Sequence, residues 1–330
     1  MSEYKGMILL NFILLSQEII NGRRITRKDD LQEFISADLA DLCKGADNIR
    51  IALCGNHVDL CTIINGRSGK CSEDCKFCAQ SGHHCTGIKE YPFLDVDTIV
   101  ADCLNNSSQG VHRYSIVTAG RTLSGKDFET AVSAYHKMNE SCNIELCASH
   151  GLLTKEQFQK LWDSGVRMYH ENIETSKRYF PYVCTTHTYD DKIRCIQMAQ
   201  EIGFKICSGG IIGMGETWED RIDMALSLAE LKVDSIPINA LMPISGTPFA
   251  EQSLLTEDEI LRTIAIFRFI NPEADIRLAA GRSLMKENGK KAFHSGANTT
   301  LTGNLLTTSG SSIANDFKML NELGFETNKE

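Results

Sequence analysis

The chain has 330 residues, which is enough for one large α/β barrel or for two ordinary domains. Its net charge of −9 and its pI near 5.5 argue against nucleic acid or an anionic membrane as a principal partner. Thirteen cysteines would indicate disulfides only in a secreted protein. We therefore expect a cytoplasmic protein whose thiols serve metal or redox chemistry.

The apolar segment 7–15 is the first feature along the chain. It is too short to span a bilayer, and it lacks the basic region and the small-residue cleavage site of a secretion signal. We expect it to form the packed face of a first helix. That helix would belong to an N-terminal helical extension over residues 1–50.

After residue 50, short β-branched runs alternate with longer helical patterns, which is typical of parallel βα units. Thr154, Thr217 and Thr256 are expected to begin helices, and Gln157 completes a capping-box pattern with Thr154. Eight strand–helix turns predict a (β/α)8 TIM-type barrel over residues 51–310, with a C-terminal helix over 311–330 packing on it. The expected strands cover residues 60–65, 111–117, 143–148, 166–171, 204–208, 234–239, 275–279 and 292–295.

Alternate positions of these strands differ in polarity. One set is rich in isoleucine and leucine, and the other is polar although barrel interiors are usually filled by Val, Ile and Leu. If the polar set faces inward, the barrel is a reaction chamber; alternatively, Arg113 and Lys205 lie at strand ends in solvent. The polar set comprises Arg113, Ser115, Glu145, Cys147, His170, Asn172, Lys205, Cys207, Asn239 and Arg277.

A cysteine triplet, Cys71, Cys75 and Cys78, follows the first expected strand. Three such thiolates can bind three irons of a four-iron cube, so the fourth iron needs an outside ligand. The triplet resembles the signature of the radical S-adenosylmethionine (SAM) superfamily, in which SAM is that ligand and an aromatic residue such as Phe77 precedes the third cysteine. A zinc knuckle would favour paired C-x2-C units, and a ferredoxin run would carry a fourth cysteine and a proline.

Six sequence blocks in order resemble the biotin synthase family over nearly the whole chain. The resemblance implies that a radical inserts one sulfur between two saturated carbons of dethiobiotin, the last step of biotin biosynthesis. It also implies a 4Fe–4S cluster, SAM, an auxiliary iron–sulfur cluster, a flavodoxin- or ferredoxin-type reductant and a homodimer. The blocks are 58–81, 205–216, 236–239, 246–248, 276–282 and 296–298.

The same resemblance assigns site residues. Cys71, Cys75 and Cys78 match the ligands of the 4Fe–4S cluster. His170, Asn172 and Asn239 match dethiobiotin contacts; His170 replaces a frequent asparagine, and the Asn239 amide can both donate to and accept from the ureido ring. Asn172 and Asn239 could alternatively cap strand ends. Residues matching the SAM site are Phe77, Ala119, Gly120, Asn172, Glu174 and Ile212, with Glu174 where the family commonly has an aspartate for the ribose hydroxyls.

The auxiliary site departs from the family pattern. Cys147, Cys207 and Arg277 match three of the four ligands of a 2Fe–2S cluster, but Ser115 replaces the fourth, and a hydroxyl is a poorer iron ligand than a thiolate. Either the cluster differs or another thiolate, such as Cys184, completes it. This pattern resembles biotin synthases of anaerobes, which are associated with a larger cluster carrying an extra sulfide. The remaining cysteines are expected to be small buried hydrophobes: Cys43, Cys54, Cys61, Cys85, Cys103, Cys142 and Cys195.

Two other classes of function remain open from the sequence. A related radical SAM enzyme without sulfur insertion, of the hydrogenase-cofactor maturase or mutase type, would lack the combined set of Cys147, Cys207, Arg277 and Asn239. An electron-transfer or cluster-carrier protein would need neither an enclosed polar chamber nor a cube that lacks one ligand.

Overall fold

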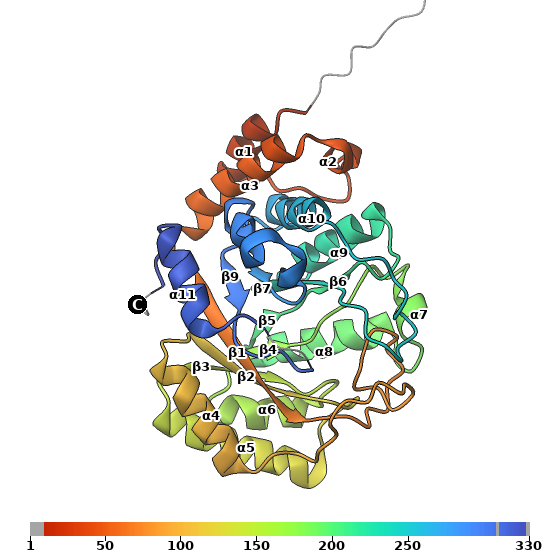
Figure 1. Cartoon of the computed structure of the whole chain (residues 1–330), viewed down its shortest axis with the longest axis vertical. Coiled ribbons are helices and arrows are strands. Elements are labelled where there is room, and N and C mark those ends of the chain that lie inside the picture. The colour runs from red at the N-terminus through yellow and green to blue at the C-terminus, as the bar shows by residue number, and fades with distance from the viewer. Residues whose placement is uncertain (1–9, 308–309, 328–330) are drawn as a thin grey trace, which may run out of the picture.

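The computed structural model describes residues 10–307 and 310–327. In this part of the chain, parallel strands form one sheet in the order β5-β4-β3-β2-β1-β9-β8-β7-β6 (Figure 1). Strand β7 pairs with both β5 and β6, so these two segments share one position and the sheet closes as an eight-stranded barrel. The expected barrel is confirmed. Its strands are β1 (Asp59–Arg67), β2 (Arg113–Thr118), β3 (Glu145–Ser149), β4 (Met168–His170), β5 (Lys205–Cys207), β6 (Gly210–Ile212), β7 (Ser235–Ala240), β8 (Asp275–Leu278) and β9 (Thr299–Leu301).

The break between β5 and β6 has a local cause. Pro237 of β7 has no backbone N–H, so it cannot donate to the neighbouring strand. Gly209 lies in the break, and a Cβ there would come within 2.1 Å of the Pro237 carbonyl oxygen. The chain can pass this point only with a glycine.

Helices between the strands surround the barrel. Capping boxes begin four of them. Those at Thr154, Thr217 and Thr256 stand where helices were expected to begin, and the fourth is at Thr188. The helices are α4 (Val96–Ser108), α5 (Gly125–Ser141), α6 (Lys155–Asp163), α7 (Phe180–Val183), α8 (Tyr189–Ile202), α9 (Trp218–Glu230) and α10 (Glu257–Ile270). Within the described residues, no helix is both long and apolar enough to cross a membrane.

The last expected strand, at 292–295, is wrong. These residues end a 3-10 segment, η2 (Lys286–His294), which follows η1 (Arg282–Leu284). Ala292 and Phe293 are buried there. The eighth strand is β9 instead, where the β-branched Thr299 and Thr300 pair with both β1 and β8.

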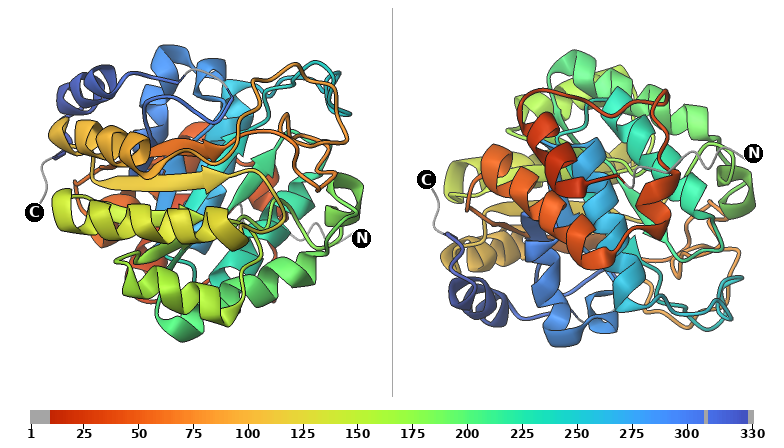
Figure 2. Two further views of the ribbon diagram at one scale, coloured as in Figure 1. Left: turned by 90° about the horizontal axis from the view of Figure 1, so that it is seen from below. Right: turned by 90° about the horizontal axis from the view of Figure 1, so that it is seen from above.

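Three N-terminal helices, α1 (Phe12–Ile20), α2 (Gln32–Ser36) and α3 (Leu39–Cys54), lie over α10 (Figure 2, right). The rings of Phe12, Phe34 and Phe269 meet edge to face, with centroids 5.0–5.7 Å apart. Phe12 and Leu15 of the expected first helix are buried, whereas Leu14 is 56% exposed. Residues 7–9 lie outside the described part. At the other end of the chain, α11 (Ile313–Glu322) buries Leu320, and Asp316 accepts from Arg282 at 2.7 Å.

The polar set of strand positions mostly faces inward. Glu145 and Lys205, at the first positions of β3 and β5, are exposed. The solvated alternative therefore holds for Lys205 but not for Arg113, which is only 8% exposed. The other eight residues line one internal cavity: Arg113, Ser115, Cys147, His170, Asn172, Cys207, Asn239 and Arg277.

Arg113 closes the N-terminal end of the barrel. Its guanidinium pairs with Asp59 at 2.9 Å, Glu145 at 2.7 Å and Asp275 at 3.3 Å. These partners come from β1, β3 and β8, so one cation joins strands on several sides of the barrel. The three carboxylates balance the charge of the buried Arg113 guanidinium. Without it, the buried carboxylates would lack a counter-charge.

We expect Arg113→Ala to lower the free energy of unfolding of the metal-free protein by about 3 kcal/mol, because Asp59 and Asp275 would lose their cation. Urea unfolding followed by circular dichroism measures the change. Lys155→Ala is the control, since it removes an exposed pair with Glu201 and should cost less than about 1 kcal/mol. Equal losses in the two variants would show that the Arg113 ion pairs do not hold the barrel together.

Candidate functional site

The barrel encloses a cavity of about 400 Å³. Inward side chains of the strands line its depth, and loops at the carboxyl ends of the strands line its mouth. Phe77 and Cys78 reach it from the loop after β1, while Asn172 and Glu174 reach it from the segment after β4. Barrel enzymes keep their chemistry at this end.

Backbone hydrogen bonds hold the cysteine loop over the mouth. The N–H of Cys71 donates to the Gln80 carbonyl at 3.0 Å, and the N–H of Cys78 donates to the Cys75 carbonyl at 2.9 Å. Burial raises the pKa of the Cys71 thiol, and the backbone at Glu73 and at Gly120, where φ is +129°, opposes that rise. Burial raises the pKa of the Cys78 thiol to about 11. The loop therefore presents partly buried sulfurs at the edge of the cavity, and soft thiolates of this kind suit iron–sulfur clusters.

The residues expected at the SAM site differ in whether their side chains line the cavity. Phe77, Asn172 and Glu174 line the cavity. Ala119 directly precedes Gly120, and the Ala119 carbonyl accepts from Arg67 Nε at 2.8 Å. Ile212 differs from them, because its side chain is fully buried in the hydrophobic core.

Strand parity explains the difference at β6. Successive side chains of a strand point to opposite faces. Ile211, and not Ile212, lines the cavity.

Glu174 is held in an unusual backbone conformation, at φ +68°. Burial raises the pKa of its carboxyl, although the ammonium of Lys192, 4.0 Å away, opposes that effect. Asn172 donates from Nδ2 to Glu174 at 3.4 Å. The carboxylate therefore stands at the cavity mouth, where it can accept from hydroxyl groups.

Both asparagines that were expected to bind substrate also bind backbone. Asn172 Oδ1 accepts from the Gly209 N–H at 3.1 Å. Asn239 Nδ2 donates to the Gly210 carbonyl at 3.0 Å, and its Oδ1 accepts from the Ala280 N–H at 3.2 Å. An amide has two donor hydrogens and two acceptor lone pairs, so Asn239 keeps one of each for a ligand.

Deeper in the cavity, two thiols lie near a guanidinium. Arg277 Nη1 donates to Cys207 Sγ at 3.2 Å, and His170 Nδ1 lies 3.3 Å from the same sulfur. Burial alone would raise the pKa of the Cys207 thiol, but the charges of Arg277 and His170 outweigh it and lower that pKa to about 6. Cys147 and Met168 pack beside Cys207.

Several buried polar atoms in this depth have no hydrogen-bond partner among the described residues. They are Arg277 Nε and Nη2 and Ser115 Oγ. Buried polar groups are normally satisfied, and an unpaired guanidinium edge suits an anionic group. Thiols, guanidinium and unpaired donors together therefore fit an iron–sulfur cluster at this depth.

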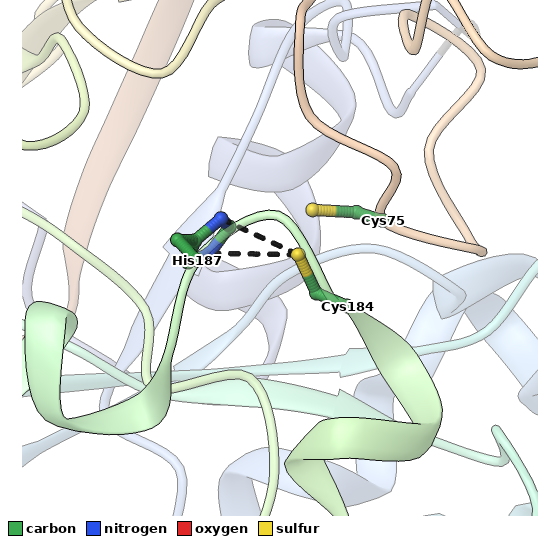
Figure 3. A group of neighbouring side chains, drawn as sticks. All are labelled: Cys75, Cys184 and His187. Carbon is green, nitrogen blue, oxygen red and sulfur yellow. Dashed lines mark hydrogen bonds between the residues drawn. The ribbon is translucent and has the colours of Figure 1, made fainter.

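Cys184 lies elsewhere, and this is a correction to its expected place in the auxiliary site. Figure 3 shows it beside Cys75 and His187, and the ligand atoms of these three residues lie within 4.8 Å of one another. Cys75 and His187 lower the pKa of the Cys184 thiol, and His187 Nδ1 lies 3.3 Å from its sulfur. Cys184 is absent from the described residues that line the cavity. The short helix α7 ends at Val183 and directs the thiol toward the cysteine loop instead.

Cys61 was expected to be an ordinary buried cysteine, but it lines the same cavity as Cys147 and Cys207. Burial raises the pKa of its thiol to about 11, against the opposing charges of Arg277 and Arg113. The alternation of polarity along β1 could have placed it inward. The sequence reasoning applied that test to the later strands only.

The chain is similar to known families and to known proteins over most of its length. Residues 67–228 match the Radical SAM superfamily, and residues 237–326 match the Biotin and Thiamin Synthesis associated domain. Proteins named biotin synthase are 66% identical over 94% of this chain in Alkaliphilus metalliredigens and 62% identical over 94% in Clostridium beijerinckii, covering 98% of each relative.

Two solved structures share the fold. Methylornithine synthase has a TM-score of 0.83 at 19% identity, covering 96% of this chain and 97% of that one. HydG, a maturase of the FeFe-hydrogenase, has a TM-score of 0.81 at 15% identity, covering 96% and 75%. At these identities the likeness concerns the fold alone.

We expect Arg277→Gln to raise the pKa of the Cys207 thiol in the metal-free protein from about 6 toward the ordinary value of about 8.5, because a neighbouring cation favours the thiolate. The thiolate absorbance of Cys207 should then appear at higher pH. A titration between pH 5 and 8, with Cys207→Ser as the blank, measures the shift. Lys205→Gln, an exposed charge change on the same strand, should leave the titration in place, and an unshifted curve in Arg277→Gln would contradict the prediction.

Proposed function

Because the chain belongs to the biotin synthase family, we propose that its barrel cavity is the chamber in which dethiobiotin is converted to biotin. The enzyme is a sulfurtransferase of the radical SAM superfamily, which implies a 4Fe–4S cluster and SAM. One observation carries the proposal. The cavity has a cysteine loop at its mouth and thiols with a guanidinium in its depth, so a substrate between them would meet both.

Cys71, Cys75 and Cys78 would hold the 4Fe–4S cluster at the mouth. Together with SAM, this cluster supplies the carbon radical that unactivated C–H bonds require. Phe77 lies in this loop and lines the cavity, and Gly120 lies at the turn after β2, so they would confine the methionine part of SAM. Glu174 would accept from the ribose hydroxyls, which its place at the mouth and its bond to Asn172 support.

Asn239 would orient dethiobiotin in the chamber through the ureido ring. Its backbone bonds to Gly210 and Ala280 fix the amide, and the remaining donor and acceptor face a ligand. His170, between the mouth and Cys207, would contact the substrate near the sulfur source. Walls of buried side chains would keep water from the substrate radical.

Cys147, Cys207 and Arg277 would hold the auxiliary cluster in the depth. Ser115 stands where the family resemblance places a fourth ligand, and its hydroxyl is a poor substitute for a thiolate. This supports the version associated with anaerobes, a larger cluster with an extra sulfide, over a 2Fe–2S cluster. The flavodoxin- or ferredoxin-type reductant and the homodimer rest on the family resemblance alone.

The test of the function uses the whole chain, reconstituted anaerobically with iron and sulfide. Supplied with dithionite, SAM and dethiobiotin, it should form both biotin and 5′-deoxyadenosine. A radical enzyme without sulfur insertion would form 5′-deoxyadenosine but no biotin. A cluster carrier would form neither, and either result would overturn the proposal.

We expect Cys75→Ala to abolish formation of 5′-deoxyadenosine, because the cube would lose one of three thiolates while already having one open iron. Circular dichroism should show an intact fold. Cys142→Ala, a cysteine at the end of α5 and away from the cavity, is the matched control and should keep the activity. Normal 5′-deoxyadenosine formation by Cys75→Ala would remove the triplet from the cluster.

We expect Asn239→Ala to weaken dethiobiotin binding roughly tenfold or more, since an unpaired buried polar group costs about 1–3 kcal/mol. The affinity for SAM should barely change. Equilibrium binding of each ligand, measured separately, gives the two numbers. A parallel fall in both affinities would mean that Asn239 supports the strand ends and does not contact the substrate.

A further inference from the structure

Cys61 points into the barrel. On β1, Leu60 belongs to the hydrophobic core and Ile64 packs against it, whereas Cys61, Thr62 and Ile63 line the cavity. Side chains alternate along a strand, so this is the expected parity. Cys61 is only 5% exposed.

The strand register fixes the depth at which Cys61 lies. In an eight-stranded barrel of shear eight, interior side chains form layers of four, contributed by alternate strands. Moving two strands round the barrel within one layer therefore means moving two residues forward from the paired position. Cys61 pairs with Arg113, and Arg113 pairs with Glu145. Two residues beyond Glu145 on β3 is Cys147, so Cys61 and Cys147 share a layer.

The same step continues round the barrel. From Cys147 it leads to Cys207 on β5, and from Cys207 it leads to Arg277 on β8. From Arg277 it returns to Cys61. The four residues therefore form one complete layer, made of three thiols and one guanidinium.

We propose that Cys61 is the third thiolate ligand of the auxiliary iron–sulfur cluster, together with Cys147 and Cys207. The proposal rests on the proposed function, which places that cluster in the chamber. Arg277 is the fourth member of the layer, and its Nε and Nη2, which lack partners among the described residues, face the cluster as hydrogen-bond donors. Three cysteine thiolates bind three irons of a four-iron cluster and leave the fourth iron without a cysteine ligand.

Two other residues compete for this role. Ser115 belongs to the next layer toward the mouth, which by the same register also contains His170, Pro237 and Leu301. It adjoins the layer of the three thiols, but its hydroxyl is a poorer iron ligand than a thiolate. Cys184 is beside Cys75. Cys61 alone among these three shares the layer of Cys147 and Cys207.

The experiment isolates the auxiliary site by replacing Cys71, Cys75 and Cys78 with alanine in the full chain. Iron and sulfide that this triple variant binds on anaerobic reconstitution then report on the chamber, independently of any turnover. Into it we place Cys61→Ser, Cys184→Ser or Cys195→Ser. Cys195 is the matched control, a buried thiol that donates to the Gly151 carbonyl at 3.7 Å and is not among the described residues that line the cavity.

We expect Cys61→Ser to lose at least half of the iron bound by the triple variant and to change its Mössbauer spectrum. Cys184→Ser and Cys195→Ser should keep both. Full iron with an unchanged spectrum in Cys61→Ser would overturn the assignment. So would an equal loss in Cys195→Ser, since the effect would then be common to buried thiols.

A second variant guards against simple misfolding of Cys61→Ser. Ser115→Cys, added to Cys61→Ser, returns a third thiol to the chamber in an adjoining layer. We expect it to restore iron binding, which a loss of packing at Cys61 would not allow; failure to restore iron in a protein with native circular dichroism would count against a ligand role. Biotin formation by the unaltered chain tests the proposed function separately, so either conclusion can fail while the other stands.

Discussion

The stagger between neighbouring parallel strands is the constraint on which this molecule depends. A barrel of eight strands closes only if the register advances round the ring, and that advance decides which inward side chains share a depth. Residues far apart in sequence, such as Cys61 and Arg277, thereby become neighbours. The two segments β5 and β6 keep this register across the Gly209 break, because both pair with β7.

A polar chamber in place of an apolar core carries an energetic cost, because buried charges must be paired. At the N-terminal end this requirement is met within the protein, since three carboxylates surround Arg113. One layer higher, the Arg277 guanidinium has a single hydrogen-bond partner among the residues that the structure describes, the sulfur of Cys207. The buried guanidinium group is thus fully paired at the closed end of the barrel and only partly paired where a cofactor would lie. Such a difference is typical of functional sites.

The mouth is organised by contacts between segments distant in the chain. The Lys76 N–H donates to the carbonyl of Val183 at 3.0 Å, which ties the cysteine loop to α7. Cys184 follows α7 directly. Its sulfur donates to Asp74 Oδ1 at 3.2 Å and lies 3.3 Å from His187 Nδ1. This link stabilises the loop that presents Cys75, and it explains why Cys184 is not deeper in the barrel.

Much of the fold and of the mouth could be determined from the sequence by itself, because the signals are local. Capping boxes, alternating polarity and the spacing of Cys71, Cys75 and Cys78 each depend on residues within a few positions of one another. The last strand was misplaced because no local sequence pattern marks it. Strand β9 is defined by its pairing with β1 and β8, which the sequence of this segment alone does not show. The depth of each inward residue was decided only by the tertiary structure, and with it the layer that Cys61 shares with Cys147 and Cys207. The place of Cys184 beside Cys75 was decided in the same way. Parity gives the face of a strand, but depth requires the register, and the register exists only once the barrel has closed.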